Sequence, residues 1–367
     1  MKKHLIAAAV AAAVVAPAAM AQVTISGNLD TGYASFKTEG TAGGVSVSDK
    51  FTRIGNANAM STSTLAFSGT EDLGGGLKAN FFVNQALNTS TGAFTARDVW
   101  ASVAGGFGTI KVGRFTPAGE TVSSRFAVSG SVNTVGSVDF IFGGNAYGGT
   151  PTRRADGAFT GAGVATGLTD LGRDAPLVEW TSSNLSGFVA TVGLSQSTGD
   201  LSTAAGENKR RQLDLALTYS AGPLAVGVTM TDNDRNGTAA IESANKDESK
   251  MNSIGASYDL GPIVLRASYI TRKDELAGVQ DSKIKLATVG ATIPLGSTSL
   301  FASYSDGSDE GNGTAAEDAD LTGYQVGAVY SLSKRTNLYA IYGSQDIEIT
   351  AADVKQSGFA IGIRHSF

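Results

Sequence analysis

Apolar and polar residues alternate with a period of two along most of this chain. In Arg211–Met230, RQLDLALTYSAGPLAVGVTM, every second residue is apolar on either side of a short turn, Ser220–Pro223. Such alternation is typical of an extended strand that has one apolar face and one polar face. The two flanking stretches are therefore predicted to form a β-hairpin with these side chains on its apolar face: Leu213, Leu215, Leu217, Tyr219, Leu224, Val226, Val228 and Met230.

Sixteen such segments follow one another, and the connections between them alternate in length. Odd-numbered connections are long and polar, such as 232–249 and 305–320, whereas even-numbered ones are short, such as 183–187 and 220–223. Strands of about ten residues with short turns on one side and long loops on the other are typical of an outer-membrane barrel. A two-sheet sandwich also alternates, but its loop lengths have no reason to alternate. The segments are expected near 22–35, 62–70, 77–88, 95–104, 108–115, 175–183, 186–196, 210–220, 223–232, 250–259, 262–273, 282–293, 297–305, 321–331, 336–346 and 354–367.

The last segment continues to the C-terminal residue, Phe367, although chain ends usually fray. In lipid, every backbone donor and acceptor needs an internal partner, so a membrane sheet persists only if it closes on itself. Closure pairs the first strand with the last, which would hold the C-terminus along its length. Phe367 would then lie at a membrane interface, where aromatic side chains form girdles. The predicted fold is all-β: a 16-stranded antiparallel transmembrane β-barrel.

The N-terminal residues have the features of a secretory signal peptide. Lys2 and Lys3 precede an apolar stretch, Leu5–Ala16, and the small-x-small sequence Ala19–Ala21 closes the segment. This segment is too short and wrongly flanked for a membrane helix. Cleavage is predicted between Ala21 and Gln22, so residues 1–21 are excluded from the fold. The alternative is a retained N-terminal helix.

Composition narrows the class of protein further. Removal of the signal peptide takes away two lysines, so 26 basic residues remain against 33 acidic ones and the net charge falls from −5 to −7. An acidic chain of this kind argues against nucleic acid as a partner. The chain has no cysteine, so no disulfide stabilises the exported protein. No run of 18 apolar residues follows the signal peptide, which excludes membrane helices but not membrane strands.

One connection, Thr116–Asp174, is much longer than the others and has no clear periodicity. A structureless stretch of this length is functional, disordered, or a sign of a missed element. Its charges nearly cancel, and it contains the apolar sequence VDFIFGG, Val138–Gly144. Because such a segment is better buried than exposed to water, we expect the connection to fold into the bore of the barrel.

Five motifs, in this order, resemble the trimeric general porins of Gram-negative outer membranes, of the beta-proteobacterial type. The resemblance implies a homotrimer, and a third extracellular loop folded into the lumen to constrict the pore. Residues 116–174 take the place of this constriction loop, within a barrel domain of residues 22–367. It also implies that Phe367 is the signal read by the barrel-insertion machinery. The motifs are VTISGNLDTGY, GTEDLGGGLKANF, GGFGTIKVGRFTP, YSLSKRTNLYAIYG and the terminal GIRHSF.

The constriction in this family sets basic residues of the wall against acidic residues of the inward loop. Arg97, in TARDVW, matches a wall arginine. Thr64 stands where the family usually has arginine, and Ser68 where it often has lysine. Glu179 falls about where another wall arginine is usual. These departures put in doubt the anion preference that is common in the family.

Alternation predicts further lumen charges at Lys78, Lys111, Arg266 and Arg364. Arg114, at the root of the long connection, either joins them or holds the loop base or a neighbouring subunit. For each charge, a solvated residue without effect on selectivity is the alternative to a functional one. The candidate pore residues are Lys78, Arg97, Lys111, Arg114, Glu120, Asp139, Glu179 and Arg266.

The chain carries few residues suited to catalysis or metal binding. Its mature part has one histidine, His365, two residues from the C-terminus, and no cysteine. A Ser-His hydrolase needs a histidine beside a nucleophile, and zinc sites need histidine or cysteine ligands. Asp232–Gly237, DNDRNG, imitates the opening of a calcium loop, but the twelfth position is Ser243. No enzyme, cofactor or metal site is predicted, although weak calcium or lipopolysaccharide bridging by the acidic loops stays open.

The predicted function is a general diffusion porin of the outer membrane. Small hydrophilic solutes and ions would move down their gradients through a water-filled bore, and lining charges would bias the ions. The partners implied are two further copies of the chain, outer-membrane lipid and lipopolysaccharide, and the insertion machinery. Two alternatives are a substrate-specific channel for a sugar or an organic acid, and a plugged structural or adhesive barrel. Phe82, Phe301 and Tyr339 are predicted to face inward, which would suit a substrate-specific channel.

Overall fold

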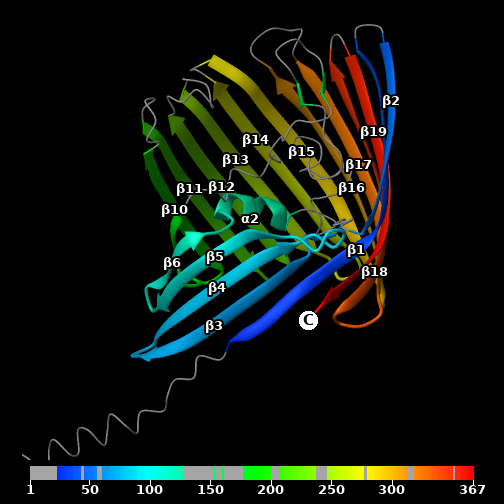
Figure 1. Cartoon of the computed structure of the whole chain (residues 1–367). Coiled ribbons are helices and arrows are strands. Elements are labelled where there is room, and N and C mark those ends of the chain that lie inside the picture. Colours follow the sequence, from blue (N-terminus) through cyan, green and yellow to red (C-terminus); the bar gives the residue numbers. More distant parts are fainter. Residues whose placement is uncertain are drawn as a thin grey trace, which may run out of the picture.

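The computed structural model (Figure 1) describes residues 23–42, 45–55, 60–126, 152–153, 159–160, 177–200, 207–236, 246–276, 279–311, 318–349 and 352–367. Seventeen of its strands form one antiparallel sheet, and two short ones pair separately. The large sheet consists of β1 (Thr24–Ala42), β2 (Val45–Gly55), β3 (Thr64–Gly74), β4 (Leu77–Leu87), β5 (Phe94–Gly105), β6 (Gly108–Arg114), β9 (Leu177–Thr181), β10 (Phe188–Asp200), β11 (Glu207–Ala221), β12 (Leu224–Asn236), β13 (Lys246–Asp259), β14 (Val264–Leu276), β15 (Val279–Leu295), β16 (Thr298–Glu310), β17 (Ala319–Ser331), β18 (Thr336–Ile349) and β19 (Ala352–Ser366).

The large sheet closes into a barrel with sixteen strand positions. Each strand of the large sheet pairs with the next one except β2 with β3, and β1 pairs with β19 from Asn28, opposite Ser366, to Ala42, opposite Ala352. On its other edge β1 pairs first with β3 and then with β2, so these two strands share one position, interrupted between Gly55 and Thr64. The remaining strands, β7 (Thr152–Arg153) and β8 (Phe159–Thr160), form the small separate sheet. The predicted fold class is confirmed.

The two ends of the barrel sequence meet at the seam between β1 and β19. The N–H of Gly27 donates to the carbonyl of Phe367 at 3.1 Å, and the N–H of Phe367 donates back at the same distance. The phenyl ring lies over Gly27, where an added Cβ would stand 2.4 Å from the ring. The last residue is thus held on both its backbone and its side chain, which explains why the alternation continues to the C-terminus.

Strands extend further than the sequence pattern predicts at the long-loop end. Residues 36–61 were expected to be a connection, but β1 continues to Ala42 and the chain returns as β2. The connection expected at 232–249 is likewise shortened, because β12 runs to Asn236 and β13 begins at Lys246. Beyond the apolar belt a strand has polar residues on both faces, so alternation no longer marks it. The expected short turns are confirmed, for example Gly222–Pro223, where Gly222 adopts a φ of 52°.

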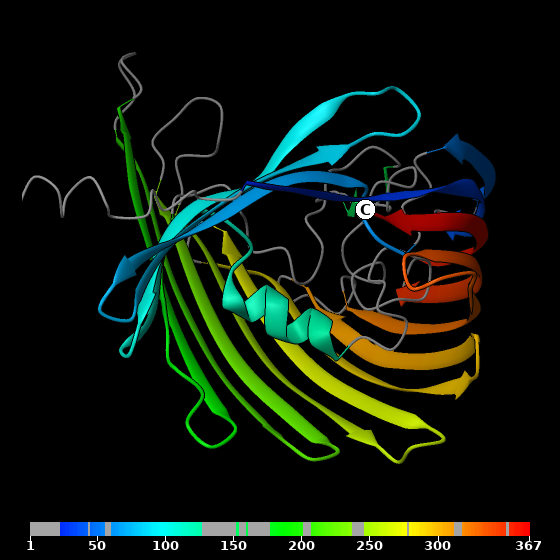
Figure 2. The same cartoon turned by 90° about the horizontal axis from the view of Figure 1, so that it is seen from below.

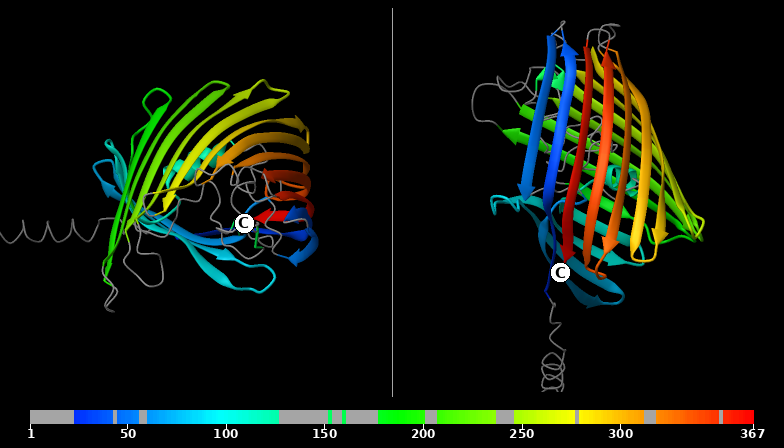
Figure 3. Two further views of the ribbon diagram at one scale, coloured as in Figure 1. Left: turned by 90° about the horizontal axis from the view of Figure 1, so that it is seen from above. Right: turned by 90° about the vertical axis from the view of Figure 1, so that its right-hand side faces the viewer.

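Side chains alternate between a polar or tightly packed inner face and an apolar, exposed outer face. On β19, Phe359 and Ile361 are 44% and 50% exposed, whereas Ala360 between them is 2% exposed. The antiparallel strands lie side by side around the ring and are tilted in the same sense (Figure 3). An exposed apolar exterior is unfavourable in water but suits a barrel surrounded by lipid. Among the described residues, no helix is long and apolar enough to span a bilayer.

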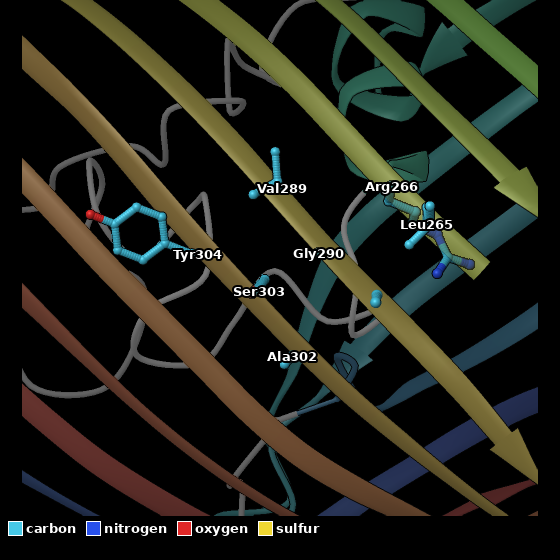
Figure 4. A pocket seen from close by; sticks show the side chains of 8 residues that line it. Leu265, Arg266, Val289, Gly290, Ala302, Ser303 and Tyr304 are labelled. Atoms are coloured by element: carbon cyan, nitrogen blue, oxygen red, sulfur yellow. The ribbon is translucent and has the colours of Figure 1, made fainter. Parts of the chain in front are cut away.

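The outer face carries a shallow groove over β14, β15 and β16 (Figure 4). Its volume is about 570 Å³, and Leu265, Val289 and Tyr304 surround a floor that includes Ala291 and Ala302. The cross-strand register places these five side chains on the outer face of the sheet. The hollow therefore belongs to the lipid-facing belt, not to the bore.

Candidate pore constriction

Helix α2 (Ala118–Arg125) begins where the chain leaves β6, and it lies inside the ring of strands (Figure 2). Pro117 precedes it with a φ of −60° and a ψ of 157°, and its side chain makes no capping hydrogen bond. The first N–H groups of a helix have no partner within the helix, so they need acceptors from elsewhere. Asp214 of β11 supplies them, because both of its carboxylate oxygens accept from the N–H of Gly119 at 3.1 Å.

Asp214 is fully buried, and its bonds tie the helix to the wall. Its Oδ1 also accepts a hydrogen bond from the hydroxyl of Thr231 on β12 at 2.5 Å. A carboxylate is favourable at a helix N-terminus, where the partial charge is positive, and a buried carboxylate requires such donors. The start of the inward segment is therefore fixed to β11 and β12.

The other end of α2 is seated over two glycines. Phe126 is 1% exposed and lies against Gly227 of β12 and Gly255 of β13. A Cβ at Gly255 would stand 2.2 Å from the Phe126 ring, and one at Gly227 would stand 2.6 Å from Val122. Only glycine leaves room for this approach. Together with Ala118 and Ala216, these side chains form an apolar cluster inside the barrel.

The inner wall at the level of Asp214 carries one continuous row of registered positions. Each member is the direct cross-strand partner of the next, from β3 around to β13. Polar side chains occupy most of the row, as expected for a wall that faces water. The row is Thr70, Asn80, Ser102, Lys111, Glu179, Gly193, Asp214, Thr231 and Met251.

Lys111 and Glu179, two of the predicted pore residues, form an ion pair within this row. Nζ of Lys111 lies 2.7 Å from Oε1 of Glu179, and Glu179 is 5% exposed. The same ammonium lies 3.7 Å from the ring centroid of Phe115 and 5.8 Å from that of Trp100. Aromatic faces stabilise a cation in this position. The positive charge of Lys111 is therefore compensated at the wall.

Two other predicted lumen residues lie at the short-turn end of the barrel. Lys78 is the second residue of β4, is exposed, and pairs in register with Asp72. Arg266 is the third residue of β14, and its Nη1 donates to the hydroxyl of Thr292 at 3.0 Å. Neither is brought next to the Lys111–Glu179 pair.

Arg97 lies at an irregularity in β5, where the pairing with β4 shifts between Val83 and Gln85. It is half-buried and directly precedes Asp98. Arg114 pairs in register with Val99, on the side of the sheet that carries Ile110 and Val112. Ile110 and Val112 are exposed on the outer face, so the register favours the loop-base or subunit alternative for Arg114.

Two acidic residues, Glu120 and Asp139, are predicted to lie on the inward loop. Glu120 belongs to α2, but its side chain lies outside the described part of the chain, as does Asp139 altogether. The described start of the long connection, residues 116–126, lies against the inner wall. The course of residues 127–151, which include VDFIFGG, stays a prediction.

Sequence reasoning missed a second buried carboxylate, Asp30 of β1. It accepts hydrogen bonds from the N–H groups of Met60 and Ser61, at 3.0 and 2.7 Å, and from the hydroxyl of Tyr339 at 2.6 Å. These bonds hold the chain between β2 and β3 against the inner wall. An acidic residue at an inward strand position, as at Asp30 and Asp214, was the available signal for both anchors.

The inner wall has two different parts. We call the inward face of β11–β15 the packed wall, because Met251, Ile270 and Leu286 there are at most 1% exposed. We call the inward face of β3–β6 and β9 the open wall, because Thr70 there is exposed, and Asn80 and Trp100 are half-buried. The packed wall holds α2, and the open wall presents polar groups to the bore.

Among the described residues, three carboxylates come close enough to share a metal ion. Oxygens of Asp232, Asp234 and Glu248 lie within 4.8 Å of one another. They are at the long-loop end, on the outer face, and Lys250 already pairs with Glu248. A lysine thus supplies the positive charge here, and the group is remote from the bore.

A second set of charges lies at the same rim. Lys283 and Lys285 of β15 contact Glu310, the last residue of β16, at 2.7 and 2.5 Å. Hydrogen bonds from Lys283 and Lys285 lower the pKa of Glu310 to about 2. A strand crosses the hydrocarbon with roughly ten residues, and Glu310 lies beyond that part of β16. Such exposed pairs contribute little to stability.

Comparisons with known proteins agree with this architecture. A family model described as Gram-negative porin matches residues 7–350. Outer membrane porin protein 32 of Delftia acidovorans is 28% identical over 392 aligned positions, which cover all of both chains.

Solved structures share the barrel. The anion-selective porin from Comamonas acidovorans has a TM-score of 0.66 at 24% identity, covering 95% of this chain and 100% of that one. OmpT of Vibrio cholerae, solved in a trimer form, has a TM-score of 0.57 at 16% identity, covering 94% and 99%. At these identities the likeness concerns the fold.

Proposed function

The chain belongs to the Gram-negative porin family, and we propose on this premise that residues 116–174 narrow its bore and set the size limit for solutes. The protein is an outer-membrane porin, a water-filled channel for passive passage of small hydrophilic solutes and ions. The observation that carries this reading is the closed ring: β1 pairs with β19, and the exposed apolar side chains point outward.

The anchoring of α2 supports the proposed constriction. A loop that narrows a channel must hold its position against solvent and solute. Asp214 fixes the N-terminus of the helix, and the glycine socket of Gly227 and Gly255 fixes Phe126. With both ends held, the segment stays in the bore without any bound cofactor or energy source.

The charges of the bore bias ions only weakly in this proposal. Lys111 is neutralised by Glu179, and Lys78 stands opposite Asp72. Arg97 is the wall cation that we propose to act on permeating ions, together with Glu120 and Asp139 from the loop. Arg266 acts at the short-turn mouth. The anion selectivity stated for the Comamonas porin is therefore not carried over to this chain.

The assembly that we propose is a homotrimer in the outer membrane. The trimer form of the Vibrio protein and the exposed apolar belt support it. In this proposal Arg114 contacts a neighbouring subunit or the base of the loop, which its register with Val99 on the outer face supports. The rim lysines Lys283 and Lys285 are suited to phosphate groups of lipopolysaccharide.

Export and insertion complete the proposal. Residues 1–21 act as a signal peptide that is cleaved between Ala21 and Gln22, and residues 22–367 form the barrel domain. Phe367 is read by the insertion machinery before the seam closes around it. The hydrogen bonds and ring contact with Gly27 support this order, because they engage the backbone and the ring of the terminal residue in the finished barrel.

Planar-bilayer recording with the purified mature protein tests the channel and the role of Arg97. Stepwise, ohmic conductance is expected, and Arg97→Ala should move the reversal potential under a salt gradient toward cation preference. Arg266→Ala, at the short-turn mouth, serves as the comparison and should have the smaller effect. Folded trimers without conductance would contradict the channel, and an unmoved potential in Arg97→Ala would remove that residue from the constriction.

A further inference from the structure

The open wall carries a pair of stacked aromatic side chains. Phe82 of β4 and Trp100 of β5 are direct cross-strand partners, with ring centroids 5.5 Å apart and ring planes inclined by 29°. Both are half-buried, unlike the fully packed apolar side chains of the opposite wall. An aromatic surface of this size beside a water-filled path is an anchor for the apolar face of a solute.

A row of neutral hydrogen-bonding side chains adjoins this pair. The hydroxyl of Thr70 donates to Oδ1 of Asn80 at 2.9 Å, and Nδ2 of Asn80 donates to the hydroxyl of Ser102 at 3.2 Å. Asn80 and Ser102 each lie two residues from the aromatic side chain on their own strand, and therefore on the same face. After these bonds, one N–H of Asn80 and lone pairs of Thr70 are still available, whereas Ser102 is buried behind Asn80 and only supports it.

Two lysines of the open wall each have an acidic neighbour. Lys78 stands opposite Asp72 on β3, and Lys111 is bonded to Glu179. Paired charges of this kind give a wall little net field. Apart from Arg97, the open wall therefore offers an ion little attraction, but it offers stacking and directional hydrogen bonds.

We propose that the open wall is a binding track for neutral carbohydrates, with Phe82 and Trp100 stacking on the sugar ring and Thr70 and Asn80 bonding its hydroxyl groups. The proposal rests on the porin function and names a solute class for it. A sugar ring has an apolar face for the aromatic pair and hydroxyls that both donate and accept. A carboxylate solute, in contrast, would need an uncompensated cation to replace its hydration.

Single-channel recording with maltotriose tests the track. Maltotriose should interrupt the current with saturating concentration dependence, whereas a polyethylene glycol of similar size should not, and succinate should not. Phe82→Ala and Trp100→Ala should each weaken the block roughly three- to tenfold, the effect of losing one aromatic contact. Equal block by maltotriose and the polymer, or stronger block by succinate, would overturn the proposal while ordinary conductance kept the porin function intact.

The chain provides a matched control and a second readout. It has two tryptophans, and the other, Trp180, lies on the outer face, where its Nε1 donates to the carbonyl of Phe107. Trp180→Phe should leave conductance and sugar block unchanged and makes Trp100 the sole tryptophan, which can be excited selectively above the absorption of tyrosine. Maltotriose should then shift the fluorescence with the same midpoint as the block. Fluorescence that does not respond at concentrations giving a block would contradict stacking on Trp100.

Discussion

The packed wall and the open wall of the same barrel differ in what their inward side chains do. On the packed wall, glycines and a buried carboxylate receive α2, and apolar residues of β13–β15 are nearly inaccessible. On the open wall, Asn80, Phe82 and Trp100 stay half-buried, and the two lysines each have an acidic neighbour. Both walls continue a single row of registered strand positions. The comparison shows that in one ring of strands one side can anchor the inward helix while the other side contacts solutes.

The largest effect is expected from emptying the glycine socket of the packed wall. Phe126→Ala removes a fully buried ring, which typically costs about 3–5 kcal/mol. Hydrogen exchange of the α2 amides should accelerate by roughly a hundredfold or more, because local opening controls it. Single-channel current should become noisier. The control is Phe188→Ala on the outer face. Equal protection of the α2 amides from exchange in both variants would contradict the distinction between the walls.

A smaller effect is expected at the other anchor of α2. Asp214→Asn keeps the size of the side chain but removes its negative charge from the helix N-terminus, at a cost of about 1–2 kcal/mol. Exchange at Gly119 should accelerate roughly tenfold, and the barrel should still fold. Asp259→Asn is the matched control, because Asp259 accepts from Gly261 in an exposed turn. If both variants behave alike, Asp214 does not hold the helix.

On the open wall, breaking a charge pair should change selectivity rather than stability. Glu179→Gln leaves Lys111 uncompensated. A unit positive charge about 7 Å away in water lowers the energy of an anion and raises that of a cation by about 0.6 kcal/mol each, so the permeability ratio should move roughly sevenfold toward anions. Reversal potentials under a salt gradient measure this. An unchanged ratio would show that the pair does not face the ion path.

The smallest effect is expected at the outer rim, remote from both walls. Glu310→Gln should change neither conductance nor the temperature at which the folded band is lost on a gel. The pKa of Glu310 is lowered to about 2. Any stabilisation that its ionised carboxylate gives the fold is therefore fully present at a pH above its ordinary pKa and is lost as the pH falls through about 2. Heat stability of the wild type and the variant should therefore agree from pH 7 to pH 4. A marked difference would give the rim a structural role.

The barrel was predictable from the sequence because alternation records which face meets lipid. Leu213, Leu215 and Leu217 carry that signal directly, and the register confirms it. The outer parts of β1 and β2 were missed because both of their faces meet water, so no period remains. The ion pair of Lys111 and Glu179 depends on two strands 68 positions apart, whose register no local pattern specifies. Gly227 and Gly255 resembled ordinary strand glycines until Phe126 was seen above them.

The contact between Gly27 and Phe367 bears on where the chain could begin and end within the same barrel. Because the two ends of the barrel already touch, a short linker between them would close the backbone without strain. New ends could then be opened at an exposed turn such as Gly222–Pro223, which joins two complete strands. A circular permutant of this kind would carry the same rows of cross-strand neighbours in a different order of synthesis.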